Sequence, residues 1–194
     1  MDALREESAK GKPIIGICNG FQILVESGLL PGTGKIDMAL AQNVMVSNKK
    51  IVRRGYYCDW INLKHDATPE RCSGSFIIDK GSILQMPIAH GEGNLVTMNK
   101  DLLQRMNENG QVVFRYCDSQ GQEIPEFPVN VNGSTENIAA ICNPEGNVLG
   151  MMPHPERAFF DYQLPPHDPR KHSGQPGPGR QVFESMKRYI EVKA

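Results

Sequence analysis

The sequence predicts an α/β domain, and the order of its first elements indicates this class. A charged segment that suits a helix, residues 2–10, precedes a short apolar run, residues 14–17, which turns at once into a second helix. A helix, strand, turn and helix in this order are typical of helices layered on a sheet. A length of 194 residues suits one substantial core, so we expect a single domain over residues 1–194.

The first elements have clear boundaries in the sequence. Gly11 ends the helix 2–10, and Pro13 prevents it from continuing. The run 14–17 contains three isoleucines, as in a strand that is buried on both faces. A helix over 21–27 follows and ends at Gly28.

The middle of the chain predicts strands, a long loop and one helix. Residues 43–47 and 51–63 are rich in β-formers and read as two antiparallel strands joined near 48–50, and residues 64–82 read mostly as loop. The further elements expected here are a strand over 83–89, an amphipathic helix over 99–109 and a strand over 112–116.

The last third predicts a hairpin, an irregular segment and a helix. Strands over 138–142 and 147–152 flank the turn 143–146, which contains proline and glycine. Prolines and glycines are frequent from 161 to 180, so we expect a long excursion there. A helix over 180–192 closes the chain, and its predicted inward-facing residues are Val182, Phe183, Met186, Tyr189 and Ile190.

Cys18 follows the predicted strand 14–17 and lies between two glycines, in the pattern G-x-C-x-G from Gly16 to Gly20. This pattern is the thiol version of a nucleophile elbow, a tight strand-to-helix turn that requires small neighbours. The helix N-terminus should favour the reactive thiolate. A buried structural cysteine between incidental glycines is the alternative.

His154 and Glu156 follow the second strand of the predicted hairpin and are two residues apart. Pro155 favours an extended backbone at His154, and in an extended chain residues i and i+2 project to the same side. A carboxylate on one imidazole nitrogen and a nucleophile on the other is the arrangement of a catalytic triad. An exposed ion pair in a proline-rich turn is the alternative.

Composition excludes several classes of function. The formal charge is −1 without a basic face, which argues against nucleic-acid binding, and the longest apolar runs are too short to span a membrane. The five cysteines are widely spaced and form no C-x-x-C pair, so we expect free thiols in a reducing cytoplasm and no metal site. A loose metal site of Cys58, His65 and Cys72 remains an alternative.

Four segments together resemble the glutaminase subunits of phosphoribosylformylglycinamidine synthase, which are class I, or triad, glutamine amidotransferases. The segments are GICNGFQIL, PIAHGEGN, NGSTENIAAI and GNVLGMMPHPERA, and the resemblance runs from Lys12 to Ala158. It implies a flavodoxin-like, three-layer sandwich around a mostly parallel sheet that carries the nucleophile elbow.

The resemblance also implies roles for individual residues. Cys18 would be the nucleophile, His154 the general base and acid, and Glu156 the residue that orients His154. The Asn19 backbone N–H would stabilise the oxyanion. The implied substrate-binding residues are Asn19, Gly20, Gln22 and a glycine-containing loop formed by Ala89, His90, Gly91 and Glu92.

The implied function is glutamine hydrolysis that supplies ammonia to a separate synthetase subunit. That subunit would use ATP and Mg²⁺ to convert formylglycinamide ribonucleotide to formylglycinamidine ribonucleotide in purine biosynthesis. A small accessory subunit would complete the complex, and the glutaminase itself would need no cofactor. These roles imply a cytoplasmic protein with no nucleic-acid or membrane partner.

The sequence departs from the family at its start, because only 17 residues precede Cys18 where the family has several dozen more. We therefore expect a sheet that lacks the family's first strands and the Gly-Gly loop that donates a second oxyanion hydrogen bond. Two alternatives follow, an impaired subunit that only binds the synthetase and another elbow-type thiol hydrolase acting on esters or peptides. We expect the segment 163–179 to contact a partner.

Overall fold

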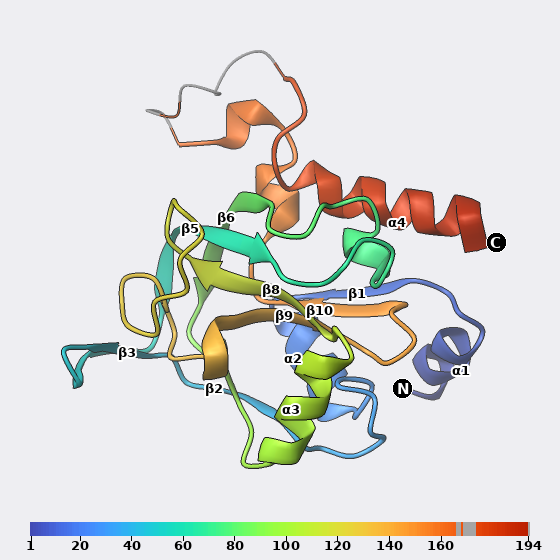
Figure 1. The fold of residues 1–194 in the computed structure, drawn as a ribbon, viewed down its shortest axis with the longest axis horizontal. Coiled ribbons are helices and arrows are strands. Elements are labelled where there is room, and N and C mark those ends of the chain that lie inside the picture. Colours follow the sequence, from blue (N-terminus) through green and yellow to red (C-terminus); the bar gives the residue numbers. More distant parts are fainter. Residues whose placement is uncertain (166–167, 169–173, 194) are drawn as a thin grey trace.

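The computed structural model describes residues 1–165, 168 and 174–193, and its centre is a six-stranded sheet (Figure 1). In their order across the sheet the strands are β1 (Ile14–Ile17), β10 (Val148–Met151), β9 (Ile138–Cys142), β8 (Val112–Cys117), β5 (Tyr57–His65) and β6 (Ile83–His90). The three strands β8, β9 and β10 are buried throughout. The expectation that residues 14–17 are buried on both faces is wrong, because β1 lies at the edge of the sheet and only Gly16 in it is buried.

The expectation of a mostly parallel sheet is wrong for the described residues. Only β1 and β10 run parallel, while the other four neighbouring pairs in this sheet are antiparallel. Parallel neighbours need a crossover connection, usually a helix, whereas β9 and β10 are joined by a tight turn and β5 and β6 by a loop without an α-helix. The one parallel pair joins strands from opposite ends of the chain.

Helices cover both faces of this sheet, so the expected three layers are confirmed (Figure 1). On one face, α2 (Asn19–Glu26) and α3 (Lys100–Glu108) pack through Phe21, Leu24 and Met106. On the other face, α4 (Arg180–Lys193) packs through Val182. The first helix, α1 (Asp2–Ala9), precedes β1, and the carbonyls of Ser8 and Lys12 accept hydrogen bonds from the buried Asn147 side chain.

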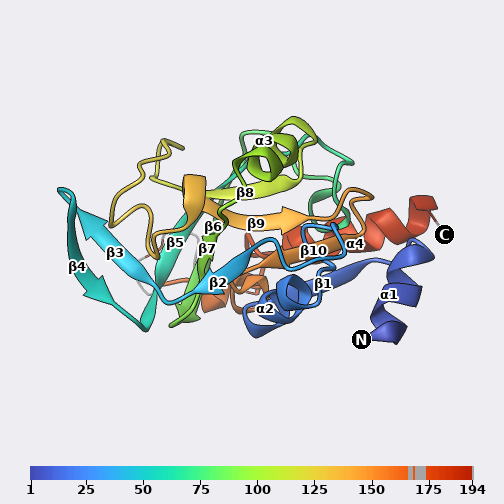
Figure 2. The ribbon, with the colours of Figure 1, turned by 90° about the horizontal axis from the view of Figure 1, so that it is seen from below.

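Two small sheets extend the fold beside the main one (Figure 2). The hairpin of β3 (Val44–Ser47) and β4 (Lys50–Arg54) confirms the antiparallel pair expected around 48–50. The expectation of one strand over 51–63 is wrong, because Gly55 adopts a φ of +85° and separates β4 from β5. The pair β2 (Ala39–Ala41) and β7 (Asn94–Val96) has three residues per strand and was not predicted.

Helix boundaries agree closely with the sequence, although α2 begins at Asn19, two residues earlier than predicted. In α4 the expectation that Ile190 faces inward is wrong, since it is 48% exposed and Ser185 is buried instead. None of the helices in the described part of the chain is long and apolar enough to cross a membrane. The segment 163–179, expected to contact a partner, includes 166–167 and 169–173, which lie outside the described residues.

Candidate active site

The parallel pair of β1 and β10 carries Cys18 and His154 at its end. Ile17 of β1 lies opposite Met151 of β10, and the Cys18 N–H donates to the Met151 carbonyl over 2.8 Å. Cys18 is one residue beyond this register pair and His154 three residues beyond it. Carboxyl ends of adjacent parallel strands meet at one edge, so the sheet itself brings the two segments together.

Cys18 has the backbone geometry of a nucleophile elbow. Its φ is 53° and its ψ is −108°, a strained conformation for a residue with a side chain, and α2 begins at the next residue. A Cβ at Gly16 would lie 2.6 Å from the Gly20 carbonyl oxygen, so a glycine is required there. At Gly20 a Cβ would meet nothing within 4 Å, so the expectation that packing requires this glycine is wrong.

His154 and Glu156 form the predicted pair, at a distance of 2.6 Å between Nδ1 and Oε1. The His154 backbone N–H donates to the Pro87 carbonyl of β6 over 2.9 Å. His154 itself has the expected non-helical backbone, with a φ of −104° and a ψ of 88°. The path does not stay extended to Glu156, because Pro155 starts a 3₁₀ turn over Pro155–Ala158, a position where its fixed φ suits a helical start. His154 is 8% exposed, and its Nε2 is buried with no hydrogen-bond partner among the described residues.

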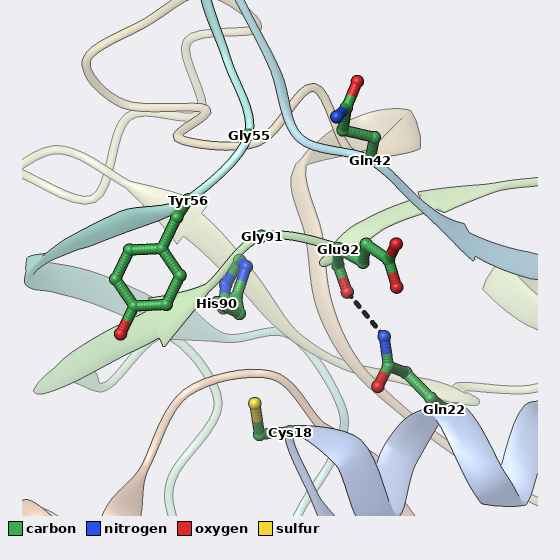
Figure 3. Close-up of a pocket in the computed structure, with 8 residues that line it drawn as sticks. All are labelled: Cys18, Gln22, Gln42, Gly55, Tyr56, His90, Gly91 and Glu92. Carbon is green, nitrogen blue, oxygen red and sulfur yellow. Dashed lines mark hydrogen bonds between the residues drawn. The ribbon is translucent and has the colours of Figure 1, made fainter.

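A cavity of about 400 Å³ opens beside Cys18 (Figure 3). In Figure 3 the Cys18 sulfur points from the start of α2 toward the side on which the His90 ring lies. The Gln22 Nε2 donates to the Glu92 carbonyl over 3.0 Å, which ties α2 to the loop after β6. The cavity is lined by Cys18, Gln22, Gln42, Gly55, Tyr56, His90, Gly91 and Glu92.

The lining contains five residues predicted from the sequence and three that were missed. Gln42, Gly55 and Tyr56 were missed because they lie in the connections on either side of the β3–β4 hairpin, far from the motifs in sequence. The only signal in the sequence for these three residues was Gly55, a glycine that interrupts the β-forming run and separates β4 from β5. Of the predicted residues, Asn19, Gly20, Ala89, His154 and Glu156 do not line this cavity.

Burial raises the pKa of the Cys18 thiol. A hydrogen bond from the Asn19 backbone N–H and the positive charge of Arg157 act in the opposite direction, while the Glu156 carboxylate raises the pKa further. The expectation that the helix N-terminus makes Cys18 a ready thiolate is therefore wrong in this structure, because desolvation outweighs it. A thiol in this state needs a base to remove its proton.

Burial also lowers the pKa of His90, to about 4, and the nearby charge of His154 acts in the same direction. His90 is 4% exposed, and a charged imidazole loses most of its hydration there. His90 is therefore neutral at physiological pH.

The cysteines do not build a metal site. All five are free, and no group of three or more His, Cys, Asp or Glu residues in the described part of the chain could hold a metal ion. The alternative site of Cys58, His65 and Cys72, all three of which are described, is therefore wrong.

Comparison with known proteins identifies the family. Residues 2–190 match the family described as a CobB/CobQ-like glutamine amidotransferase domain. The chain is 66% identical, over its whole length, to the phosphoribosylformylglycinamidine synthase subunit PurQ of Methanothrix thermoacetophila, and 48% identical, over 86% of its length, to that of Aquifex aeolicus. It spans 73% and 64% of those two proteins.

A solved structure has the same fold. The structure of PurLQS from Thermotoga maritima matches 96% of this chain with a TM-score of 0.66 and 33% sequence identity, and the match covers 66% of that chain. The α/β fold predicted from the elbow is thus confirmed, with a mixed sheet. The chain therefore belongs to the family of glutamine amidotransferase domains that includes the PurQ subunits of phosphoribosylformylglycinamidine synthase.

Proposed function

We propose that this chain hydrolyses glutamine with Cys18, His154 and Glu156 and supplies the ammonia to a synthetase subunit. The observation that carries the proposal is the placement of a strained elbow cysteine and a His–Glu pair at the ends of two parallel strands. The names of the relatives support the synthetase that converts formylglycinamide ribonucleotide to formylglycinamidine ribonucleotide in purine biosynthesis. Residues 1–194 would act as one glutaminase domain.

The first chemical step is removal of the thiol proton. The Glu156 carboxylate accepts the Nδ1–H of neutral His154, which leaves Nε2 as the basic nitrogen. This nitrogen takes the Cys18 proton as the sulfur attacks the side-chain amide carbon of glutamine. The Asn19 backbone N–H, next to the sulfur, donates to the oxyanion that forms.

Collapse of the tetrahedral intermediate breaks the carbon–nitrogen bond, and His154 gives its proton to the leaving ammonia. A γ-glutamyl thioester remains on Cys18. His154 then removes a proton from water, which attacks the thioester, and glutamate leaves as the thiol is restored. Glu156 stabilises the imidazolium in both steps.

The cavity provides the binding surface for the rest of the glutamine. Gln22 and Glu92 are held against each other, so α2 and the loop after β6 form one wall. Gly91 belongs to the same loop, while Asn19 and Gly20 lie at the start of α2. The expectation that Ala89 and His90 are loop residues is wrong, because β6 extends to His90 and pairs both of them with β5. We further propose that this subunit needs no cofactor and that the synthetase subunit uses ATP and Mg²⁺. A small accessory subunit completes the complex, which is cytoplasmic.

A glutamine-analogue diazoketone, which alkylates the nucleophile of amidotransferases, tests the proposal. Mass spectrometry should find one label on Cys18, glutamine should slow the labelling, and Cys18→Ala should abolish both labelling and ammonia release. The matched control is Cys58→Ala, since Cys58 is a free and exposed cysteine outside the cavity.

The same experiment separates the alternatives. Labelling of Cys18 without ammonia release, even with the synthetase present, would favour a subunit that only binds its partner. Labelling by a generic ester probe, with no protection by glutamine, would favour a thiol hydrolase of another specificity and contradict the proposal.

A further inference from the structure

Asn43 is a buried polar residue next to the cavity, but it is neither a motif residue nor part of the lining. It lies in the connection between β2 and β3, and its exposed fraction is 0%. Buried amides persist in proteins where each polar atom has a partner. The side-chain partners of Asn43 lie in two loops beside the cavity, that of Gly55 and the one that begins at His90, the last residue of β6.

The Asn43 side chain joins these two loops. Its Nδ2 donates to the Gly55 carbonyl over 3.1 Å and to the His90 carbonyl over 2.8 Å. Its Oδ1 accepts the Gly93 N–H over 2.8 Å. The backbone adds two bonds, from the Asn43 N–H to the Gly91 carbonyl over 2.8 Å and from the Gly55 N–H to the Asn43 carbonyl over 3.1 Å.

These backbone partners also settle which way the amide is turned. Two carbonyl oxygens require the NH₂ group on one side, and the Gly93 N–H requires the oxygen on the other. The same oxygen lies 3.2 Å from the Nδ1 of His90. An oxygen can only accept, so the His90 proton belongs on Nδ1 and the Nε2 carries a lone pair.

The ring of His90 is fixed in place as well. A Cβ at Gly93 would lie 2.2 Å from its Cε1, so the ring packs directly on that glycine. Burial keeps the ring neutral. Neutrality matters for the proposed mechanism, because a second positive charge would oppose the imidazolium that forms on His154.

We propose that Asn43 is a positioning residue for glutamine binding, which holds the loops of Gly55 and residues 90–93 as one wall and fixes His90 as the Nδ1–H tautomer. This role rests on the proposed function, since the wall is that of the glutamine cavity. Asn43 touches no reacting atom, so its loss should affect substrate binding more than the chemical step.

The experiment compares Asn43→Ala with Asn147→Ala. Asn147 is a matched control, because it is equally buried and its Nδ2 donates to two backbone carbonyls, those of Ser8 and Lys12, at the opposite end of β1. The readouts are KM and kcat for glutamine, and the glutamine concentration that protects Cys18 from iodoacetamide. Both are measured on the full chain with its synthetase.

Asn43→Ala should raise KM and the protecting concentration by roughly tenfold or more, because the side chain loses its four hydrogen bonds to Gly55, Gly93, the His90 carbonyl and the His90 ring. A tenfold change corresponds to the loss of only about one to two hydrogen bonds. The value of kcat and the alkylation rate without glutamine should stay within about threefold. Asn147→Ala should lower the stability of the fold without changing KM. An unchanged KM in Asn43→Ala, or equal increases in both variants, would overturn the proposal.

Asn43→Asp covers the case in which the alanine variant does not fold. It keeps an acceptor for Gly93 and His90 but sets a carboxylate against the carbonyls of Gly55 and His90, so KM should rise again. Nitrogen-15 NMR of the unliganded wild-type chain should find the His90 proton on Nδ1, and a proton on Nε2 would overturn the assignment. Lack of glutamine protection in the wild-type chain would instead contradict the proposed function, and the NMR result would still test Asn43.

Discussion

Acidification should destabilise this protein through His90, whose neutral ring is buried in the cavity wall. Burial lowers the pKa of His90 from 6.5 to about 4 in the folded chain. Below about pH 6.5 the unfolded chain binds a proton at this residue, while the folded chain does not until about pH 4. The free energy of unfolding must therefore fall as the pH falls through this interval and level off below it.

The size of the effect follows from the two pKa values. Each pH unit between them is worth about 1.4 kcal/mol, so the whole interval amounts to roughly 3 kcal/mol. Between about pH 7 and about pH 5, the contribution of His90 alone is about 2 kcal/mol. This is a large share of the roughly 5–15 kcal/mol by which folded domains are stable.

Urea unfolding of the wild-type chain and of His90→Gln at both pH values measures this contribution. The variant has no titrating ring, so its loss of stability between the two pH values should be smaller than that of the wild type by about 2 kcal/mol. Burial lowers the pKa of His65 too, so His65→Gln should flatten the pH dependence in the same direction. Equal losses in wild type and His90→Gln would refute the reasoning.

Two further predictions concern packing and a buried charge. Gly150→Ala should lower the free energy of unfolding by about 1–3 kcal/mol, because the new Cβ would lie 2.1 Å from the Phe21 ring. A Cβ at Gly20 would meet no atom within 4 Å, so Gly20→Ala should leave the free energy of unfolding unchanged or raise it by up to about 1 kcal/mol. Arg115→Met should cost about 2 kcal/mol, because Arg115 is 7% exposed and donates to Asp66 over 2.7 Å and to the Glu136 carbonyl over 2.7 Å. The exposed Arg188, paired with Glu191 at 3.5 Å, is its control, and Arg188→Met should change stability by less than about 0.5 kcal/mol. Urea titration measures all four variants, and a Gly20→Ala chain less stable than Gly150→Ala, or equal costs at Arg115 and Arg188, would contradict these predictions.

The parts of the site that depend on local sequence could be predicted. The elbow requires a glycine two residues before Cys18 and a strand directly before it, and both are visible in residues 14–18. The His154 and Glu156 pair was likewise visible from its spacing, although the turn that closes it is a 3₁₀ turn begun by Pro155. Local patterns of this kind fix local geometry.

The parts that depend on long-range contacts could not be predicted. The direction of neighbouring strands is set by connections and pairing partners, which is why a mostly parallel sheet was expected and a mixed one was found. Gly55 and Tyr56 line the same cavity as Cys18, although they are far from it in sequence, so only the tertiary structure brings them together. Asn43 is a single polar residue in an irregular connection, and its importance comes from bonds to residues 12 to 50 positions away.

The parallel pairing of β1 and β10 has a consequence for how this site tolerates change. Cys18 and His154 are aligned by four consecutive register pairs, from Ile14 with Val148 to Ile17 with Met151. A slip of one residue would move His154 by about 3.3 Å along the strand and turn its neighbours to the other face. The alignment of the proposed nucleophile, Cys18, with the proposed base, His154, is thus governed by a backbone ladder. The surrounding loops can therefore change in sequence and length while these two residues keep their alignment.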